Sequence, residues 1–475
     1  MKVRTRYAPS PTGFMHVGNL RSAIFEYLIA KNNNNGDFLL RIEDTDQTRK
    51  VEGAVEFIYD TCKLCGLDFD EGPNNPGKYG PYTQSERLDI YQEYAHKLVE
   101  MGKAYYCFCS PERLDDLRRE ADERKIAFLY DGHCKKLTNE EIEERIANGE
   151  SYVIRQKMPK EGTSTYEDIV YGEIVVENRI LEDQILLKSD GFPTYNFANV
   201  IDDHLMEITH VARGNEYLMS TPKYNLLYDA FGWEKPTYIH LPMVLGSDGQ
   251  KLSKRNGDAS FMDLYHDGYL PEGVVNYLAL LGWSPETTDE IFTLEELIKI
   301  FNPKRISKSP SIYDIKKLNW INAHYMKKLD IDTLCSITVP HLKEAYDLSN
   351  KSDEWIKHLV SIYQDHISYG KEIVEVTDLF FKDNIDYNDE CKEFMSDETV
   401  PNTLRIFKEE IENITDWTVD NINLVINNVK EKANVKGKML YMPIRIKVSG
   451  QMHGPELPDT IYLLGKDIIL KRLSK

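Results

Sequence analysis

The stretch "RYAPSPTGFMHVGNLRSAIFEYLIAK", residues 6–31, changes character twice along its length. Residues 3–8 predict a short strand, and from Leu20 onward the apolar residues follow the i, i+3, i+4 spacing of an amphipathic helix. The asparagine-rich segment 32–36 ends that helix, and "DFLLRIE" at 37–43 predicts a second strand. A strand, a helix and a strand in this order indicate a parallel sheet with a right-handed crossover.

One histidine, His16, lies between the first strand and the helix. Ligands of open parallel sheets bind outside the carboxyl ends of the strands, which is where residues 8–19 and 43–46 both fall. Gly18 permits close approach of the backbone, and the start of a helix attracts phosphate. A histidine there can donate a hydrogen bond to a phosphate oxygen, although a lone loop histidine is more often solvated or structural. The sequence has neither a Walker A loop nor a G-x-G-x-x-G after a strand.

A second glycine-rich stretch, "GSDGQKLSKRNG" at 246–257, carries Lys251 and Lys254 at the tip of a loop. Ammonium groups on such a loop suit closing over a triphosphate, because they can follow the charge that migrates during phosphoryl chemistry. A solvated basic turn is the commoner interpretation of any one such loop. The two stretches together favour a nucleotide site.

Composition sets the outer limits of the function. The chain has 475 residues, enough for two or three domains, and 41% of them are hydrophobic, as in water-soluble globular proteins. No apolar run approaches ~18 residues, so we expect no membrane partner. Seven scattered cysteines argue against a disulfide framework and for the reducing cytoplasm. The net charge of −20 disfavours indiscriminate nucleic-acid binding, but the basic stretches 301–328 and 430–447 leave local phosphate contacts open.

"HVGN" at 16–19 and "KLSKR" at 251–255 resemble the HIGH and KMSKS signatures of class I aminoacyl-tRNA synthetases. Asn19 replaces the second histidine of the first signature, and Leu252 replaces methionine in the second. Further segments in fixed order are similar to the bacterial glutamyl-tRNA synthetases along nearly the full chain. These segments are "LRIEDTD", "GPYTQSERLDIY", "GFPTYNFANVIDDHLMEITHVARGNEYLMSTPKYNLLY" and "GQMHGPELPD".

The resemblance implies an α/β fold. It consists of a class I synthetase Rossmann-type parallel sheet with an α+β acceptor-binding insertion, followed by an all-α anticodon-binding region. The two halves of the catalytic domain would be 1–106 and 189–258, and the insertion would be 107–188. A helical stem-contact region would occupy 259–325, and the anticodon-binding domain 326–475.

The implied activity is that of a glutamate–tRNA ligase. L-glutamate would react with ATP, accompanied by Mg²⁺, to give glutamyl-adenylate and pyrophosphate, and the 3′-terminal adenosine of tRNA-Glu would receive the glutamyl group. A non-discriminating form that also glutamylates tRNA-Gln is the alternative that the sequence leaves open. We expect a cytoplasmic monomer.

The resemblance also assigns residues one by one. The catalytic residues would be His16, Lys251 and Lys254. ATP would be bound by these three together with Gly18 and Glu216, although Asn215 stands in "RGNEY" where an acid is common. Glutamate would be bound by Arg6, Ala8, Ser10, Glu43, Tyr195, Asn199 and Arg213. The chemistry is consistent, because two carboxylates and one ammonium require arginines and one fixed acid, and bidentate arginine–carboxylate pairs are strong.

Three cysteines, Cys107, Cys109 and Cys134, lie within one short segment and suit a structural Zn²⁺. The spacing alone leaves the fourth ligand open, with His133 next to Cys134. Zinc-bearing members of the resembled family share the pattern Cys-x-Cys…Tyr-x₃-Cys, which implies Tyr130. Three reduced cysteines in an insertion that folds without metal are the alternative.

Four alternative functions fit the sequence less well. A small-molecule nucleotidyltransferase with a similar loop would not need a helical region of ~150 residues. An enzyme that glutamylates a modified tRNA base resembles only the catalytic half. A catalytically inactive binding module would not require the intact histidine, lysines and arginines. Glutaminyl-tRNA synthetases carry β-barrels where this chain predicts helices.

Overall fold

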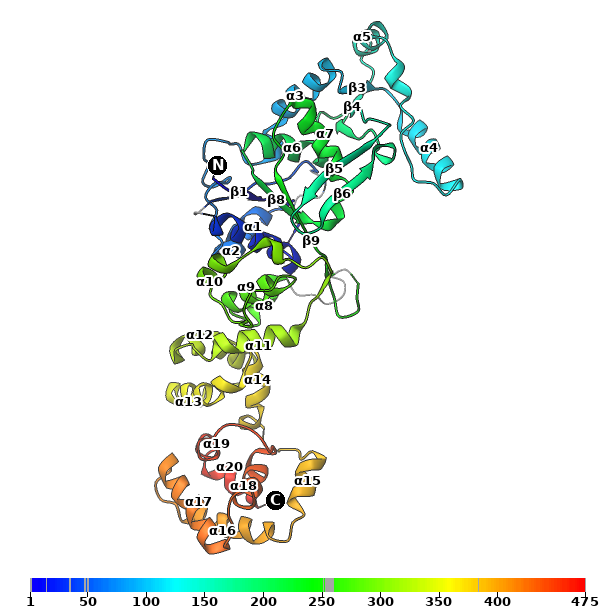
Figure 1. Cartoon of the computed structure of the whole chain (residues 1–475). Helices are drawn as coiled ribbons and strands as arrows, with labels where there is room; N and C mark the ends of the chain where they lie inside the picture. The colour runs from blue at the N-terminus through cyan, green and yellow to red at the C-terminus, as the bar shows by residue number, and fades with distance from the viewer. Residues whose placement is uncertain are drawn as a thin grey trace. The chain divides into compact units, whose positions relative to one another are not determined.

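The computed structural model describes residues 2–13, 15–33, 36–46, 48, 51–250, 252, 260–382 and 384–474 (Figure 1). The chain divides into two compact units. The first comprises Met1–Asp263 and Val275–Asp314, and the second comprises Leu264–Val274 and Ile315–Lys475. Helices α8 (Phe261–His266) and α9 (Pro271–Leu280) each run across a boundary between the units.

The opening stretch forms the predicted strand–helix–strand unit. β1 (Arg4–Tyr7) and β2 (Asp37–Leu40) pair in parallel, and α1 (Val17–Asn32) connects them. Helix α1 is buried on most of its surface, including Leu20, Ile24 and Leu28, because it lies against both β1 and β8 (His210–Gly214). The backbone N–H of Thr209, just before β8, donates to the carbonyl of Arg4, so β8 adjoins β1. The parallel-sheet prediction is therefore confirmed.

The sheet continues through β9 (Thr237–Leu241), which pairs in parallel with β8. The hairpin of β5 (Thr163–Asp168) and β6 (Gly172–Glu177) extends it, since Asp168 at the end of β5 is in register with Tyr238 of β9. The segments on either side of the hairpin form an antiparallel sheet in the order β3 (Ala104–Cys107), β4 (Val153–Gln156) and β7 (Ile185–Leu187).

Helices cover these sheets. Tyr91, Phe197 and Leu227 belong to one core that joins α3 (Leu88–Glu100), α6 (Tyr195–Leu205) and α7 (Thr221–Phe231) to β3, β4 and β7. The other elements of this unit are α2 (Ala54–Leu64), α4 (Pro111–Glu123), α5 (Asn139–Ala147), β10 (Val244–Leu245), α10 (Leu294–Ile300) and β11 (Ser311–Ile312).

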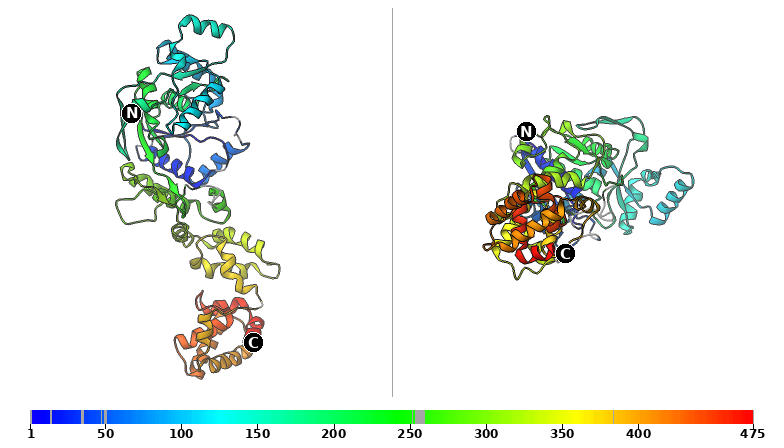
Figure 2. Two further views of the ribbon diagram at one scale, coloured as in Figure 1. Left: turned by 90° about the vertical axis from the view of Figure 1, so that its right-hand side faces the viewer. Right: turned by 90° about the horizontal axis from the view of Figure 1, so that it is seen from below.

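Within its described residues the second unit contains helices and no strand. The helices after α9 are α11 (Ile315–Met326), α12 (Ile331–Ala345), α13 (Asp353–Tyr363), α14 (Glu372–Thr377), α15 (Asp389–Met395), α16 (Val400–Asn413), α17 (Val419–Ala433), α18 (Lys438–Ser449), α19 (Leu457–Leu464) and α20 (Lys466–Leu473). Both views of Figure 2 show the orange and red helices α16 to α20 gathered into one bundle. Leu359 of α13, Phe407 of α16 and Ile444 of α18 are fully buried in the apolar core of the second unit. The all-helical prediction for this part is confirmed.

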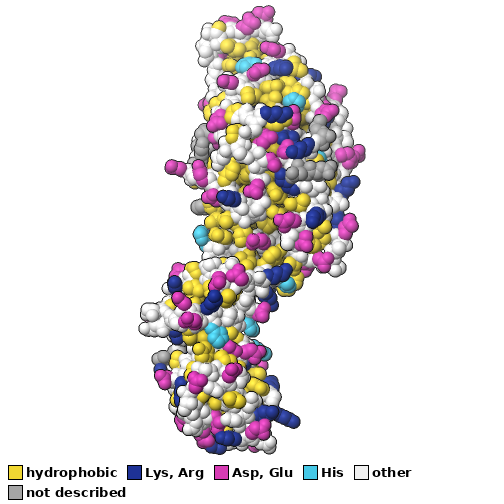
Figure 3. Space-filling model, turned by 90° about the vertical axis from the view of Figure 1, so that its left-hand side faces the viewer, with side chains coloured by type: hydrophobic (Ala, Val, Ile, Leu, Met, Phe, Trp, Pro, Cys, Tyr) yellow, Lys and Arg dark blue, Asp and Glu magenta, His cyan; other side chains and the backbone are white. Residues whose placement is uncertain are grey.

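In the described part of the chain, no helix combines the length and the apolar character that a membrane span requires. Lysine and arginine side chains are interspersed with aspartate and glutamate on the face drawn in Figure 3.

Candidate active site

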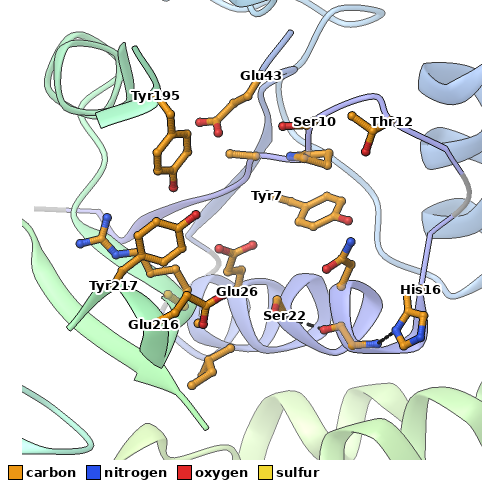
Figure 4. Close-up of a pocket in the computed structure, with 18 of the residues that line it drawn as sticks. Tyr7, Ser10, Thr12, His16, Ser22, Glu26, Glu43, Tyr195, Glu216 and Tyr217 are labelled. Carbon is orange, nitrogen blue, oxygen red and sulfur yellow. Dashed lines mark hydrogen bonds between the residues drawn. The ribbon is translucent and has the colours of Figure 1, made fainter. Parts of the chain in front are cut away.

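A cavity of about 950 Å³ opens at the carboxyl ends of the parallel strands. Nine of the predicted site residues line it: Arg6, Ala8, Ser10, His16, Gly18, Glu43, Tyr195, Arg213 and Glu216. Figure 4 shows Glu43, Tyr195 and Tyr217 toward one end of this cavity and His16 at the other. The fold therefore gathers the first strand–helix loop, the end of β2 and the end of β8 around one space.

His16 is the N-cap residue of α1, and its Nδ1 accepts a hydrogen bond from the backbone N–H of Gly18 at 3.2 Å (Figure 4). A neutral imidazole that accepts at Nδ1 carries its proton on Nε2. The ring is thus held at the positive end of the helix dipole with Nε2–H as a donor, an arrangement that suits an anionic ligand.

Lys251 and Lys254 lie outside the described residues. Leu252, which separates Lys251 from the rest of the signature, lines the cavity, and its N–H donates to the carbonyl of Val244 at 3.2 Å. Leu252 is therefore held at the edge of the same cavity that His16 lines.

Arg6 lies in a buried network of charges. Its Nε donates to Asp203 at 3.0 Å and its Nη1 to Glu26 at 3.2 Å. Arg41 donates to the same Asp203 at 2.7 Å and to Glu43 at 2.9 Å. Two arginines therefore share Asp203, and both are already paired within the protein.

The protonation of these acids follows from burial and from the arginines. Burial raises the pKa of Asp203, but Arg6 and Arg41 more than offset this effect and leave its pKa below the usual value. Burial raises the pKa of Glu43 and of Glu26, and the arginines offset it only in part. Glu26 lines the cavity, and its Oε2 has no hydrogen-bond partner among the described residues. Sequence reasoning missed Glu26; an acid among the apolar residues of α1 was its one signal.

Arg213 is bound differently from Arg6. Its Nη2 donates to Thr221 Oγ1 at 2.7 Å and its Nε to His240 Nε2 at 3.3 Å, and no carboxylate of the described residues forms an ion pair with it. Its guanidinium lies 4.6 Å from the ring centroid of Tyr224 and 5.2 Å from that of Tyr217. Aromatic faces stabilise a cation without neutralising it, so Arg213 remains a binding group for an anion.

The other two predicted glutamate ligands lie on α6. Burial raises the pKa of Tyr195, whose ring lies 5.5 Å from that of Tyr217. Asn199 is buried one turn later and is not among the residues that line the cavity, and its Nδ2 has no hydrogen-bond partner in the described part of the structure.

The cysteine cluster forms a separate site in the insertion. The sulfur atoms of Cys107, Cys109 and Cys134 lie within 4.8 Å of one another. The phenolic oxygen of Tyr130 lies 3.3 Å from the sulfur atoms of Cys107 and Cys109, and it accepts from the backbone N–H of Cys134 at 3.2 Å. The side-chain hydrogen bond with Cys134 lowers the pKa of the Cys107 thiol to about 4. His133 is exposed and is not part of the cluster. Three thiols and one phenol thus form a compact donor set of the size that zinc requires.

Comparison with known proteins identifies the family to which this fold belongs. The model of the family "tRNA synthetases class I (E and Q), catalytic domain" matches residues 2–320. The chain belongs to the class I tRNA synthetases (E and Q). A second model, for an anticodon binding domain, matches residues 333–475 of this class I synthetase.

Relatives of this class I synthetase match over its whole length. A glutamate–tRNA ligase of Clostridium botulinum (strain Loch Maree / Type A3) is 50% identical, with 100% of this chain and 97% of the relative covered. The glutamate–tRNA ligase of Clostridium novyi (strain NT) is 51% identical, with 99% and 97% covered. The crystal structure of a glutamate tRNA ligase from Elizabethkingia meningosepticum CCUG26117 in complex with its amino acid superposes with a TM-score of 0.86 at 34% identity. It covers 100% of this chain and 99% of its own.

Proposed function

We propose that the protein is a glutamate–tRNA ligase, which activates L-glutamate with ATP and transfers it to the 3′-terminal adenosine of tRNA-Glu. One observation carries the proposal: a histidine capping a helix and Arg213, which has no ion-pair partner among the described residues, line the same cavity at the strand ends. The full-length relatives named glutamate–tRNA ligase support it.

The first step forms a bond between an α-carboxylate oxygen of glutamate and the α-phosphorus of ATP, and the bond from that phosphorus to pyrophosphate breaks. Mg²⁺ bound with ATP would neutralise phosphate charge. His16 donates from Nε2 to the phosphates as their charge shifts. Lys251 and Lys254 of the signature loop stabilise the same negative charge. No protein nucleophile is needed, so the protein acts by alignment and charge stabilisation.

Glutamate is selected by charge. Arg213 pairs with a substrate carboxylate, because, unlike Arg6, it has no acidic partner among the described residues. Arg6 contributes its one remaining N–H donor, since the other four face Asp203, Glu26 and the carbonyl of Ala212, and it keeps the acids beneath the cavity in place. One carboxylate oxygen of Glu43 accepts a hydrogen bond from Arg41, and the other accepts from the substrate ammonium. Ala8, Ser10 and Tyr195 complete the lining of the amino-acid pocket, and Asn199 lies one turn after Tyr195 on α6. A neutral glutamine would leave a buried arginine charge unmatched, which costs binding.

In the second step the terminal ribose hydroxyl of the tRNA attacks the carbonyl carbon of glutamyl-adenylate, and AMP leaves. The insertion would hold the acceptor end, and the helical part matched by the anticodon-binding model would bind the anticodon. Cys107, Cys109, Tyr130 and Cys134 would bind a structural Zn²⁺ that braces the insertion, since their donor atoms already converge.

The test is charging of purified tRNAs by the purified full-length protein, together with pyrophosphate exchange in the presence of tRNA. We expect glutamylation of tRNA-Glu, dependent on ATP, and no charging with glutamine. Failure of glutamate to support exchange with tRNA-Glu present would overturn the proposal. An assay with tRNA-Gln run in parallel distinguishes a non-discriminating enzyme from one that charges tRNA-Glu alone.

A further inference from the structure

Arg213 contacts a buried histidine, His240. His240 of β9 is the direct register partner of Arg213 in β8, and its side chain is fully buried. Its Nε2 lies 3.3 Å from Arg213 Nε and 3.2 Å from the hydroxyl of Thr221, which itself accepts from Arg213 Nη2. Two of the five guanidinium N–H donors are thereby anchored on the protein side, so the direction of the remaining donors is fixed.

The opposite side of the ring is held by an acid. Nδ1 of His240 lies 2.7 Å from Asp168 Oδ2, and a carboxylate can only accept, so the ring proton resides on Nδ1. Burial lowers the pKa of His240, which keeps the ring neutral although Asp168 opposes the shift. The charged groups that act on the ring are Asp168 of β5, Arg213 of β8 and Glu216 of η5 (Asn215–Tyr217). A neutral ring protonated on Nδ1 presents a lone pair at Nε2, which accepts from Arg213.

Asp168 is itself rigidly placed. Its Oδ1 accepts the backbone N–H groups of Val170 at 2.9 Å and Tyr171 at 2.8 Å, and its Oδ2 also accepts the backbone N–H of His240 at 3.0 Å. Asp168 ends β5 in register with Tyr238 of β9, so the strand pairing carries the carboxylate to the ring. The hydrogen-bonded series Asp168–His240–Arg213 runs from the β5–β6 hairpin to the cavity.

We propose that Asp168 and His240 are positioning residues that aim Arg213 at the substrate carboxylate by fixing the tautomer of the histidine. The inference rests on the proposed role of Arg213 in binding glutamate. An acid that holds a histidine in one tautomer is a known device of serine hydrolases; here the histidine accepts from an arginine and takes no proton.

Two variants of His240 form a matched pair. In His240→Gln the longer side chain can place an amide oxygen where Nε2 was, so an acceptor for Arg213 remains. In His240→Asn the amide reaches the position of Nδ1 and not that of Nε2, so the acceptor is lost. We expect His240→Asn to raise the KM for glutamate about 10-fold or more, because a hydrogen bond to a charged group is lost. The KM for ATP and kcat should stay within about twofold, and His240→Gln should recover most of the loss.

Asp168→Asn tests separately whether the tautomer of His240 matters. The amide can donate to Nδ1 and favours the tautomer with Nε2–H, which would meet Arg213 donor to donor. We expect the same selective rise in the glutamate KM, and this variant and His240→Gln decide the test if His240→Asn does not fold.

Equal glutamate KM values for His240→Asn and the unmodified protein would overturn the inference. So would a parallel rise in the KM for both substrates in His240→Asn and His240→Gln, which a purely structural role produces. Arg213→Ala separates the two proposals. If it leaves the glutamate KM unchanged, the assignment of Arg213 fails; if only the His240 and Asp168 variants are without effect, the positioning role alone fails.

Discussion

At the scale of single residues, two arginines of one cavity differ in how much of their positive charge is available to a substrate. Arg6 forms ion pairs with Asp203 and Glu26, whereas Arg213 has aromatic rings and neutral acceptors around it. An arginine whose charge is already compensated gains little from one more anion. An uncompensated buried arginine gains much, because the electrostatic interaction is strong at low local dielectric. Arg213 is therefore the residue on which discrimination for an acidic substrate should depend.

Arg213→Ala should raise the KM for glutamate on the order of 100-fold, since loss of one partner from a buried charged pair costs ~2–5 kcal/mol. The KM for ATP should change by less than about twofold. Steady-state kinetics with each substrate varied in turn measures both values. Arg179→Ala is the matched control, because Arg179 is 76% exposed and pairs only with Glu177 among the described residues. Similar effects on glutamate and ATP would contradict the assignment.

Lys254→Ala should slow adenylate formation about 100-fold, because a cation that stabilises transition-state charge contributes ~3 kcal/mol. Binding of glutamate should be nearly unchanged, since this lysine is expected at the phosphates. A single-turnover measurement of adenylate formation isolates the step from product release. An unchanged rate would remove Lys254 from the mechanism.

At the scale of elements, the cysteine cluster is joined to the sheet of β3, β4 and β7, and the chain after β7 reaches the cavity at Lys188. β3 carries Cys107 and pairs with β4, and Arg155 of β4 stacks over the ring of Tyr130 at 4.2 Å. The cluster is thus tied to the sheet by both a hydrogen-bonded ladder and a cation–π contact. Loss of the metal should loosen the insertion before it affects the strands at the cavity.

Untreated protein should contain about one zinc per chain. Tyr130→Phe should weaken metal retention in the presence of a chelator, while Cys109→Ser should abolish it, because a thiolate is the stronger zinc ligand. Metal analysis by mass spectrometry, with circular dichroism to follow folding, measures both effects. His133→Ala is the control and should retain the metal. Metal-free protein with normal folding would exclude the site.

At the scale of the whole molecule, a chain of net charge −20 must bind a polyanion through local basic surfaces. Lys304, Arg305 and Lys308 are exposed in the basic stretch 301–328. Arg305 and Lys308 donate to backbone carbonyls of the same unit. Lys304 is therefore the cleanest position at which to remove one contact with phosphate.

Lys304→Ala should raise the KM for tRNA several-fold and reduce the slope of log K against log[salt] by about 1, because one fewer counterion is released. The KM for glutamate should remain unchanged. Lys235→Ala removes an exposed lysine of the same compact unit and is the comparison for a general effect of charge. An unaltered salt slope would show that Lys304 does not contact the tRNA backbone.

Several features of the fold and of the site could be predicted from the sequence alone. The periodicity of residues 3–43 predicted a parallel strand–helix–strand unit, and it placed His16 and Glu43 at the ligand-binding edge. Apolar residues also recur at helical spacing in 355–363 and 404–414, where α13 and α16 occur. These features follow from local patterns, because the spacing of apolar residues reports which face of an element is buried.

Other features were decided only by the tertiary structure. Asp203 forms an ion pair with Arg6 across 197 positions of sequence. Strand register places His240 beside Arg213, and the β5–β6 hairpin brings Asp168 to His240. Asn199 matched the pocket by resemblance yet lies outside the cavity lining. The physical reason is that the partner and the protonation of a buried charge depend on which distant groups packing brings within a few ångströms. No local window of sequence contains that information.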